Sequence, residues 1–91
     1  VASFKEAEKW AKFIGFRLGK VLYVNSYRYD GYLIDVYEHE SKSIIMYIRE
    51  KTVLGFKILN PNYSYKEYLR DRLKNFSMIE ISGGVLYNRL L

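Results

Sequence analysis

The sequence predicts an α+β fold in which an antiparallel β-sheet of about four to six strands is covered on one face by two helices. Apolar residues recur at helical spacing in two segments, 3–14 and 64–76. Between and after these segments lie runs rich in β-branched and aromatic residues, separated by turn signals. The expected element order is α-β-β-β-β-α-β-β, in a single domain that spans residues 1–91.

Both helices are predicted from their first turns as well as from their periodicity. Ser3 and Glu6 can form a capping box at the start of the first helix, and Gly15 can end it. Ser64 and Glu67 form the same pair at the start of the second helix. The two amphipathic segments are therefore expected to pack their apolar sides on the sheet.

Six strands are predicted, and turn dipeptides close two of their hairpins. Asp30-Gly31 suits a two-residue hairpin because both positions tolerate positive φ, and Gly83-Gly84 gives a similar signal. Consecutive hairpins produce an antiparallel sheet. The predicted strands are residues 21–29, 32–39, 43–50, 53–59, 78–81 and 85–90.

Composition limits the classes of function that fit the chain. The formal net charge of +5 favours an anionic partner. Cysteine is absent, so we expect a cytoplasmic protein without disulfides or thiolate metal sites. No apolar run approaches the roughly 20 residues that span a bilayer. Glutamine is absent while Lys, Arg, Glu and Ile abound, which is typical of proteins that work at high temperature.

No catalytic motif stands out, so we expect a protein that is not an enzyme and that uses no cofactor or metal. His39 is the only histidine, and we interpret it as a solvated residue at a strand end. Asp35 followed by Glu40-Ser41-Lys42 resembles a motif of Mg²⁺-dependent nucleases, an acidic residue on one strand and Glu-x-Lys on the next. In that motif, carboxylates hold the metal and the lysine stabilises the phosphate. We expect Glu40 to Lys42 to form a tight turn instead. A nuclease remains a distant alternative.

Rows of positive charge along both predicted helices are the most informative feature. Like charges at i, i+4 cost a helix roughly 0.2–0.5 kcal/mol each, so their repetition favours a surface kept for an anionic partner. Glu67 and Asp71 can offset the repulsion on the second helix, which would leave an ordinary solvated face. The candidate nucleic-acid-binding residues on the helices are Lys5, Lys9, Lys12, Lys66, Arg70 and Lys74.

A tyrosine-rich sheet face is the second candidate surface. Aromatic rings near Arg28 and Lys57 can stack on the bases of a single strand, although tyrosine is also simply a good strand former. The register expected from the Asp30-Gly31 turn gives one face the residues Tyr23, Tyr27, Tyr29, Tyr32, Ile34 and Val36.

Arg72 lies within the apolar side of the second helix. Its guanidinium can extend outward to solvent, pair with a buried carboxylate such as Asp35, or contact a partner protein. The C-terminal hairpin can also offer an exposed edge to a partner. The candidate partner-interface residues are Arg72, Tyr27, Tyr29, Tyr32, Tyr87 and Leu90.

These patterns favour a non-catalytic accessory protein or small subunit that binds nucleic-acid backbone with weak sequence specificity, or that docks in a nucleic-acid-processing complex. The alternative is a pure protein–protein interaction module that uses its tyrosine and leucine surface.

Overall fold

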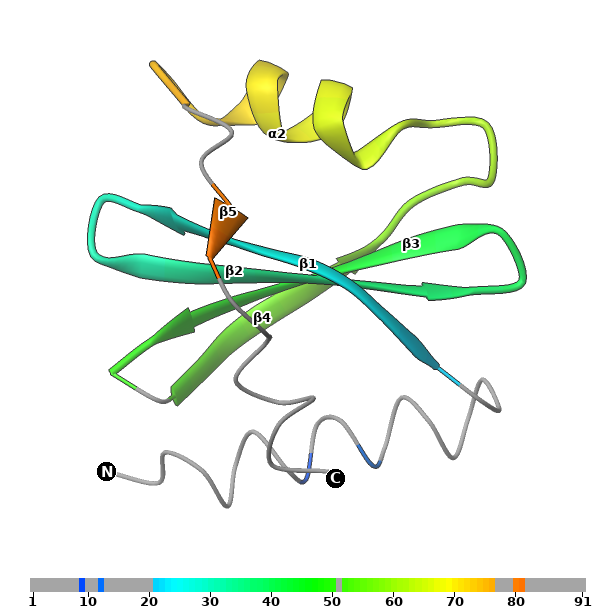
Figure 1. Cartoon of the computed structure of the whole chain (residues 1–91), viewed down its shortest axis with the longest axis horizontal. Coiled ribbons are helices and arrows are strands. Elements are labelled where there is room, and N and C mark those ends of the chain that lie inside the picture. Colours follow the sequence, from blue (N-terminus) through cyan, green and yellow to red (C-terminus); the bar gives the residue numbers. More distant parts are fainter. Residues whose placement is uncertain (1–8, 10–11, 13–20, 51, 77–79, 82–91) are drawn as a thin grey trace.

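The computed structural model of the chain describes residues 9, 12, 21–50, 52–76 and 80–81. The predicted α+β class with an antiparallel sheet is confirmed in these ranges (Figure 1). Most of the predicted first helix and the last predicted strand lie outside the described residues. The elements are β1 (Leu22–Tyr29), β2 (Tyr32–His39), β3 (Lys42–Arg49), β4 (Thr52–Ile58), α2 (Tyr65–Arg72) and β5 (Glu80–Ile81).

The sheet is an antiparallel meander with one short added strand. Strands β1 to β4 pair in sequence order, and β5 pairs with the free side of β1, which gives the order β4-β3-β2-β1-β5. Helix α2 crosses one face of this sheet (Figure 1). The predicted bounds of the four meander strands agree with the structure to within one residue.

The hairpins of the meander are closed by residues with positive φ. Asp30 (46°) and Gly31 (81°) close the β1–β2 hairpin, which confirms the predicted turn. Glu40 (48°) and Ser41 (68°) close the β2–β3 hairpin without a glycine. At the β3–β4 hairpin, Glu50 also has a positive φ of 50°. These short turns fix the register of the strands that they join.

Two β-bulges change which side chains share a face of the sheet. In β1, Val24 is an extra residue, because Tyr23 pairs with Tyr37 and Asn25 pairs with Val36. The bulge reverses the alternation, so the prediction that Tyr23 shares a face with Tyr27 is wrong. Leu54 is the extra residue of a second bulge, in β4.

Both faces of the sheet bury apolar side chains, which corrects the prediction of a single covered face. Beneath α2 lies the cluster Tyr27, Ile34, Val36, Ile45, Leu59, Tyr68 and Leu69, and we call this side the α2 face. On the opposite side, the second face, lies the cluster Tyr37, Ile44, Met46, Ile48 and Val53. The sheet is therefore a central layer of the fold.

Helix α2 begins as predicted and ends earlier. Ser64 caps it, because the Ser64 hydroxyl accepts a hydrogen bond of 3.2 Å from the Lys66 N–H. The helix ends at Arg72, one turn before the predicted end, since Leu73 is extended and Asn75 has a φ of 57°. This turn brings Phe76 back over the rings of the sheet. No helix in the described ranges is long and apolar enough to cross a membrane.

Candidate functional site

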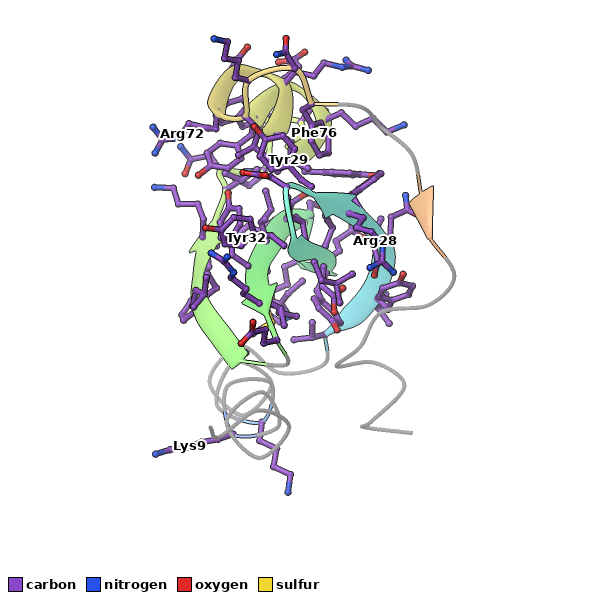
Figure 2. All side chains as sticks on the ribbon, turned by 90° about the vertical axis from the view of Figure 1, so that its left-hand side faces the viewer. Lys9, Arg28, Tyr29, Tyr32, Arg72 and Phe76 are labelled. Carbon is purple, nitrogen blue, oxygen red and sulfur yellow. The ribbon has the colours of Figure 1, made fainter. Side chains whose placement is uncertain are left out.

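A groove of about 520 Å³ opens on the α2 face, between α2 and the strands. Four tyrosines line it, one each from β1, β2, β3 and α2: Tyr29, Tyr32, Tyr47 and Tyr68. We call it the tyrosine groove. Figure 2 looks onto this side of the molecule, with Tyr29 beneath α2 and Tyr32 farther from the helix. Its volume lies in the range of pockets that hold small molecules or parts of larger ligands.

Gly55 keeps one side of the tyrosine groove open. It pairs with Tyr47 across the β3–β4 ladder, so both residues belong to the α2 face. Apart from its two chain neighbours, a Cβ atom built on Gly55 would meet no atom of the described residues within 4 Å. The missing side chain therefore leaves the ring of Tyr47 with empty space beside it. Glycine weakens a strand interior, and it often marks a place where a ligand approaches the backbone.

Cations surround the aromatic walls. The guanidinium carbon of Arg49 lies 5.2 Å from the ring centre of Tyr32, and that of Arg72 lies 5.5 Å from the ring centre of Tyr68. Both distances are within the range of cation–π contact. Lys57, from β4, also lines the tyrosine groove, and none of its lining residues in the described ranges is Asp or Glu. The site thus combines aromatic surface with positive charge.

The Tyr68 hydroxyl lies between two donors. Arg72 Nε donates to it at 3.5 Å, and it shares a hydrogen bond with the Tyr47 hydroxyl. Burial raises the pKa of Tyr68, but these hydrogen bonds and the charges of Arg72 and Lys57 outweigh burial and lower it. Burial and the Tyr68 contact raise the pKa of Tyr47. Tyr68 is therefore the more acidic phenol of the pair.

The predicted basic row on the second helix is exposed, and it has no carboxylate partner among the described residues. Lys66, Arg70 and Lys74 are all exposed, and we call them the α2 basic row. No ion pair within 4.0 Å joins them to Glu67, Asp71 or another carboxylate of the described ranges. The ion pair found in these ranges joins His39 to Glu40 at 3.7 Å. The expected neutralisation by Glu67 and Asp71 is thus not formed by direct contact.

The predicted basic row on the first helix is described only at Lys9 and Lys12. Figure 2 shows Lys9 on the opposite side of the sheet from Arg72 and α2. Lys9 and Lys12 are exposed, and Lys5 lies outside the described residues. Lys9 therefore does not extend the α2 basic row.

The remaining predicted residues divide between the groove, the core and the second face. Tyr29, Tyr32 and Lys57 meet in the tyrosine groove. Tyr27 is instead a core residue with no exposed surface, and its ring lies 5.8 Å from that of Phe76. Arg28 is exposed, but it pairs with Leu33 of the second face and lies far from Lys57 in the strand order. Tyr87 and Leu90 lie outside the described residues.

Arg72 extends outward to solvent, which is one of the three alternatives predicted for it. Its side chain is exposed and packs over the Tyr68 ring. The alternative pairing with Asp35 is wrong, because Asp35 lies on the second face and α2 covers the other. Arg72 is therefore available to a ligand at the edge of the tyrosine groove.

Asp35 belongs to a buried polar cluster. Its carboxylate accepts hydrogen bonds from Ser26 at 2.7 Å and from Tyr37 at 3.1 Å. Glu40 lies in the hairpin turn, so roughly 13 Å of extended strand separates Asp35 from the residue before that turn. Lys42 begins β3 and is exposed. Within the described ranges, no three His, Cys, Asp or Glu residues converge as metal ligands would.

Sequence reasoning missed the residues that shape the groove: Tyr47, Gly55, Arg49 and the role of Tyr68. A glycine inside a strand-forming run was the available signal, because such a position marks a bulge or a close approach. No protein-family model, no curated protein and no solved structure matches this chain.

Proposed function

We propose that this chain is a non-catalytic accessory protein that binds nucleic-acid backbone along α2. One observation carries the proposal: the α2 basic row is exposed and makes no ion pair with a carboxylate of the described residues. Cations that a protein keeps for its own stability are usually placed beside opposite charges. Unpaired cations in a row fit the regular negative charge of a phosphate chain.

Contacts of this kind give a particular type of binding. Each lysine or arginine that neutralises a phosphate releases counterions, so affinity falls steeply as salt increases. Phosphate contacts orient a protein on nucleic acid without reading bases. The proposed protein therefore binds with weak sequence specificity, alone or as a subunit of a nucleic-acid-handling complex.

A salt titration of binding tests the proposal. Fluorescence anisotropy with labelled duplex DNA should show binding at low salt, with log affinity falling linearly against log salt concentration. The double variant Arg70→Gln/Lys74→Gln should bind more weakly and flatten that slope by roughly 1.8, since each phosphate contact adds about 0.9 for duplex DNA.

Lys9→Gln/Lys12→Gln is the matched control, because it removes the same charge and Lys9 lies on the other side of the sheet. This control should keep most of the wild-type slope. An equal loss in both variants would mean that net charge, not α2, governs binding. Absence of binding at low salt would refute the proposal altogether. Cleavage of the DNA when Mg²⁺ is added would contradict the non-catalytic part, with Asp35→Ala as the control.

A protein–protein interaction module is the competing proposal. Leu54 is 57% exposed and Leu22 is 51% exposed, and large apolar side chains of this kind often become buried by a partner. Stable co-purification with a larger protein, together with no retention on a nucleic-acid column, would favour this second function.

A further inference from the structure

We infer that the tyrosine groove takes an unpaired base of single-stranded nucleic acid, so that the protein prefers single strands to duplexes. This inference rests on the proposed nucleic-acid binding and names the substrate class. Tyr29, Tyr32, Tyr47 and Tyr68 bring aromatic surface from four different elements around one opening. Bases stack on such side chains whatever their sequence, because every base has a π face.

The charge around the groove matches a base that is attached to phosphates. Among the residues that the structure describes, its lining contains Lys57 and no carboxylate. Arg49 and Arg72 lie over the rings of two lining tyrosines, and Arg72 is exposed beside the opening. A neutral apolar ligand would gain nothing from these cations, whereas a nucleotide offers a planar ring to the tyrosines and phosphates to the cations.

The hydroxyl groups favour a polar ring over a hydrocarbon. The Tyr68 oxygen accepts a hydrogen bond from Arg72 and shares one with the Tyr47 hydroxyl, which leaves one phenol proton of the pair to donate. Carbonyl oxygens and ring nitrogens of an unpaired base are acceptors for such a proton. In a duplex these groups are paired and the rings are stacked on their neighbours, so only a single strand can offer them to the groove.

Gly55 provides a way to fill the groove without disturbing the fold. Its φ is not positive, and it lies on the α2 face opposite Tyr47. Apart from the two chain neighbours, an added Cβ meets no atom of the described residues within 4 Å. Gly55→Ile therefore places a branched side chain in the open space, and isoleucine suits a strand better than glycine. Gly55→Ala serves as the small-side-chain member of the same series.

The test compares binding to a labelled oligodeoxythymidine of about ten nucleotides with binding to a duplex of equal length. The wild type should prefer the single strand. Gly55→Ile should weaken single-strand binding by roughly 5- to 150-fold, the loss of one stacked base, and leave duplex binding unchanged. Gly55→Ala should have a smaller effect. A thermal melt checks that each variant is folded.

A second variant tests the aromatic wall itself. Tyr32→Leu should also weaken single-strand binding, because Tyr32 is half-buried in the groove and its ring lies beneath the guanidinium of Arg49. Tyr63→Leu is the matched control, since Tyr63 is 38% exposed and does not line the groove.

Failure of this inference can be separated from failure of the proposed function. Salt-dependent binding with no preference for single strands, or with no response to Gly55→Ile and Tyr32→Leu, would overturn the groove assignment alone. If the wild type binds neither the single strand nor the duplex, both proposals are overturned. Preference for the duplex would also overturn the groove assignment.

Discussion

The Ser26 hydroxyl donates a 2.7 Å hydrogen bond to the carboxylate of Asp35 across the β1–β2 ladder, and neither residue has any exposed surface. Tyr37 donates to the other carboxylate oxygen, and the Tyr23 hydroxyl lies 2.8 Å from that of Ser26. A buried carboxyl group is tolerated when such partners replace water. This network fixes the pairing of β1 and β2 on the second face.

Ser26→Ala should destabilise the fold by about 1–3 kcal/mol, because it removes a donor from a buried carboxyl group. Urea denaturation followed by circular dichroism measures the loss. Ser43→Ala is the matched control, since Ser43 is only half-buried in β3 and its hydroxyl makes no hydrogen bond to the described residues. Equal stabilities of the two variants would contradict the role of the Ser26–Asp35 bond.

Two glycines should respond to alanine in opposite ways. Gly31 has a φ of 81°, so Gly31→Ala forces a side chain into the left-handed region at a cost of about 1–2 kcal/mol. Gly55 lies in a strand with open space around its Cα, so Gly55→Ala should raise stability by roughly 0.5 kcal/mol. The melting temperatures of the two variants test this difference. A lower melting temperature for Gly55→Ala than for the wild type would mean that the space beside Tyr47 is closed.

Loss of the α2 cap should weaken the helix. Ser64→Ala leaves the Lys66 N–H without its side-chain acceptor and should cost about 1 kcal/mol. Ser64→Asp keeps an acceptor and adds a negative charge at the helix N-terminus, so it should retain the wild-type stability. Thermal unfolding of both variants provides the comparison. If Ser64→Asp loses as much thermal stability as Ser64→Ala, loss of the cap does not explain the destabilisation.

Arg72 should control the ionisation of Tyr68. Arg72→Gln removes a hydrogen bond and a positive charge that lower the Tyr68 pKa, so the pKa should rise relative to the wild type. Arg70→Gln removes an equal charge from an exposed position and should change the pKa less. Carbon NMR of ring-labelled tyrosine, with Tyr68→Phe to assign the signal, measures the shift. An unchanged pKa in Arg72→Gln would contradict the contact.

The same shift links stability to pH. The pKa of Tyr68 is lowered in the folded protein, so its ionisation stabilises the fold above the unfolded value of 10.0. That contribution is lost as pH falls through the folded pKa. The raised pKa of Tyr47 acts in the opposite sense: its contribution is fully present below 10.0, falls above that pH, and is lost once the pH has risen through its folded value. The wild type should therefore gain stability over Arg72→Gln as the pH approaches 10.0, which urea titrations at increasing pH can measure.

Much of the fold follows from local patterns in the sequence. Asp30-Gly31 correctly located the first hairpin, and Ser64 correctly marked the start of α2. These features depend on backbone conformations that few residues adopt and on caps that few side chains supply. Hairpins joined by short turns then leave an antiparallel meander as the natural arrangement.

The two bulges and the groove could not be predicted in the same way. Val24 and Leu54 are ordinary strand residues, and only pairing with a neighbouring strand shows that each is extra. The single bulge at Val24 was enough to move Tyr23 to the second face. The groove depends on Tyr47 and Gly55, which pair in neighbouring strands, and on Tyr68 of α2, which lies farther along the chain. Their meeting is set by how α2 lies on the sheet.

The bulge at Leu54 also has a consequence for the outer edge of the sheet. Strand β4 is the last strand on its side among the described residues. A regular edge strand with unpaired backbone groups can pair with strands of other chains and so start fibril growth. An extra residue interrupts the regular row of N–H and C=O groups and increases the local twist. Leu54 therefore helps a chain rich in strand-forming residues to avoid fibril growth from this side.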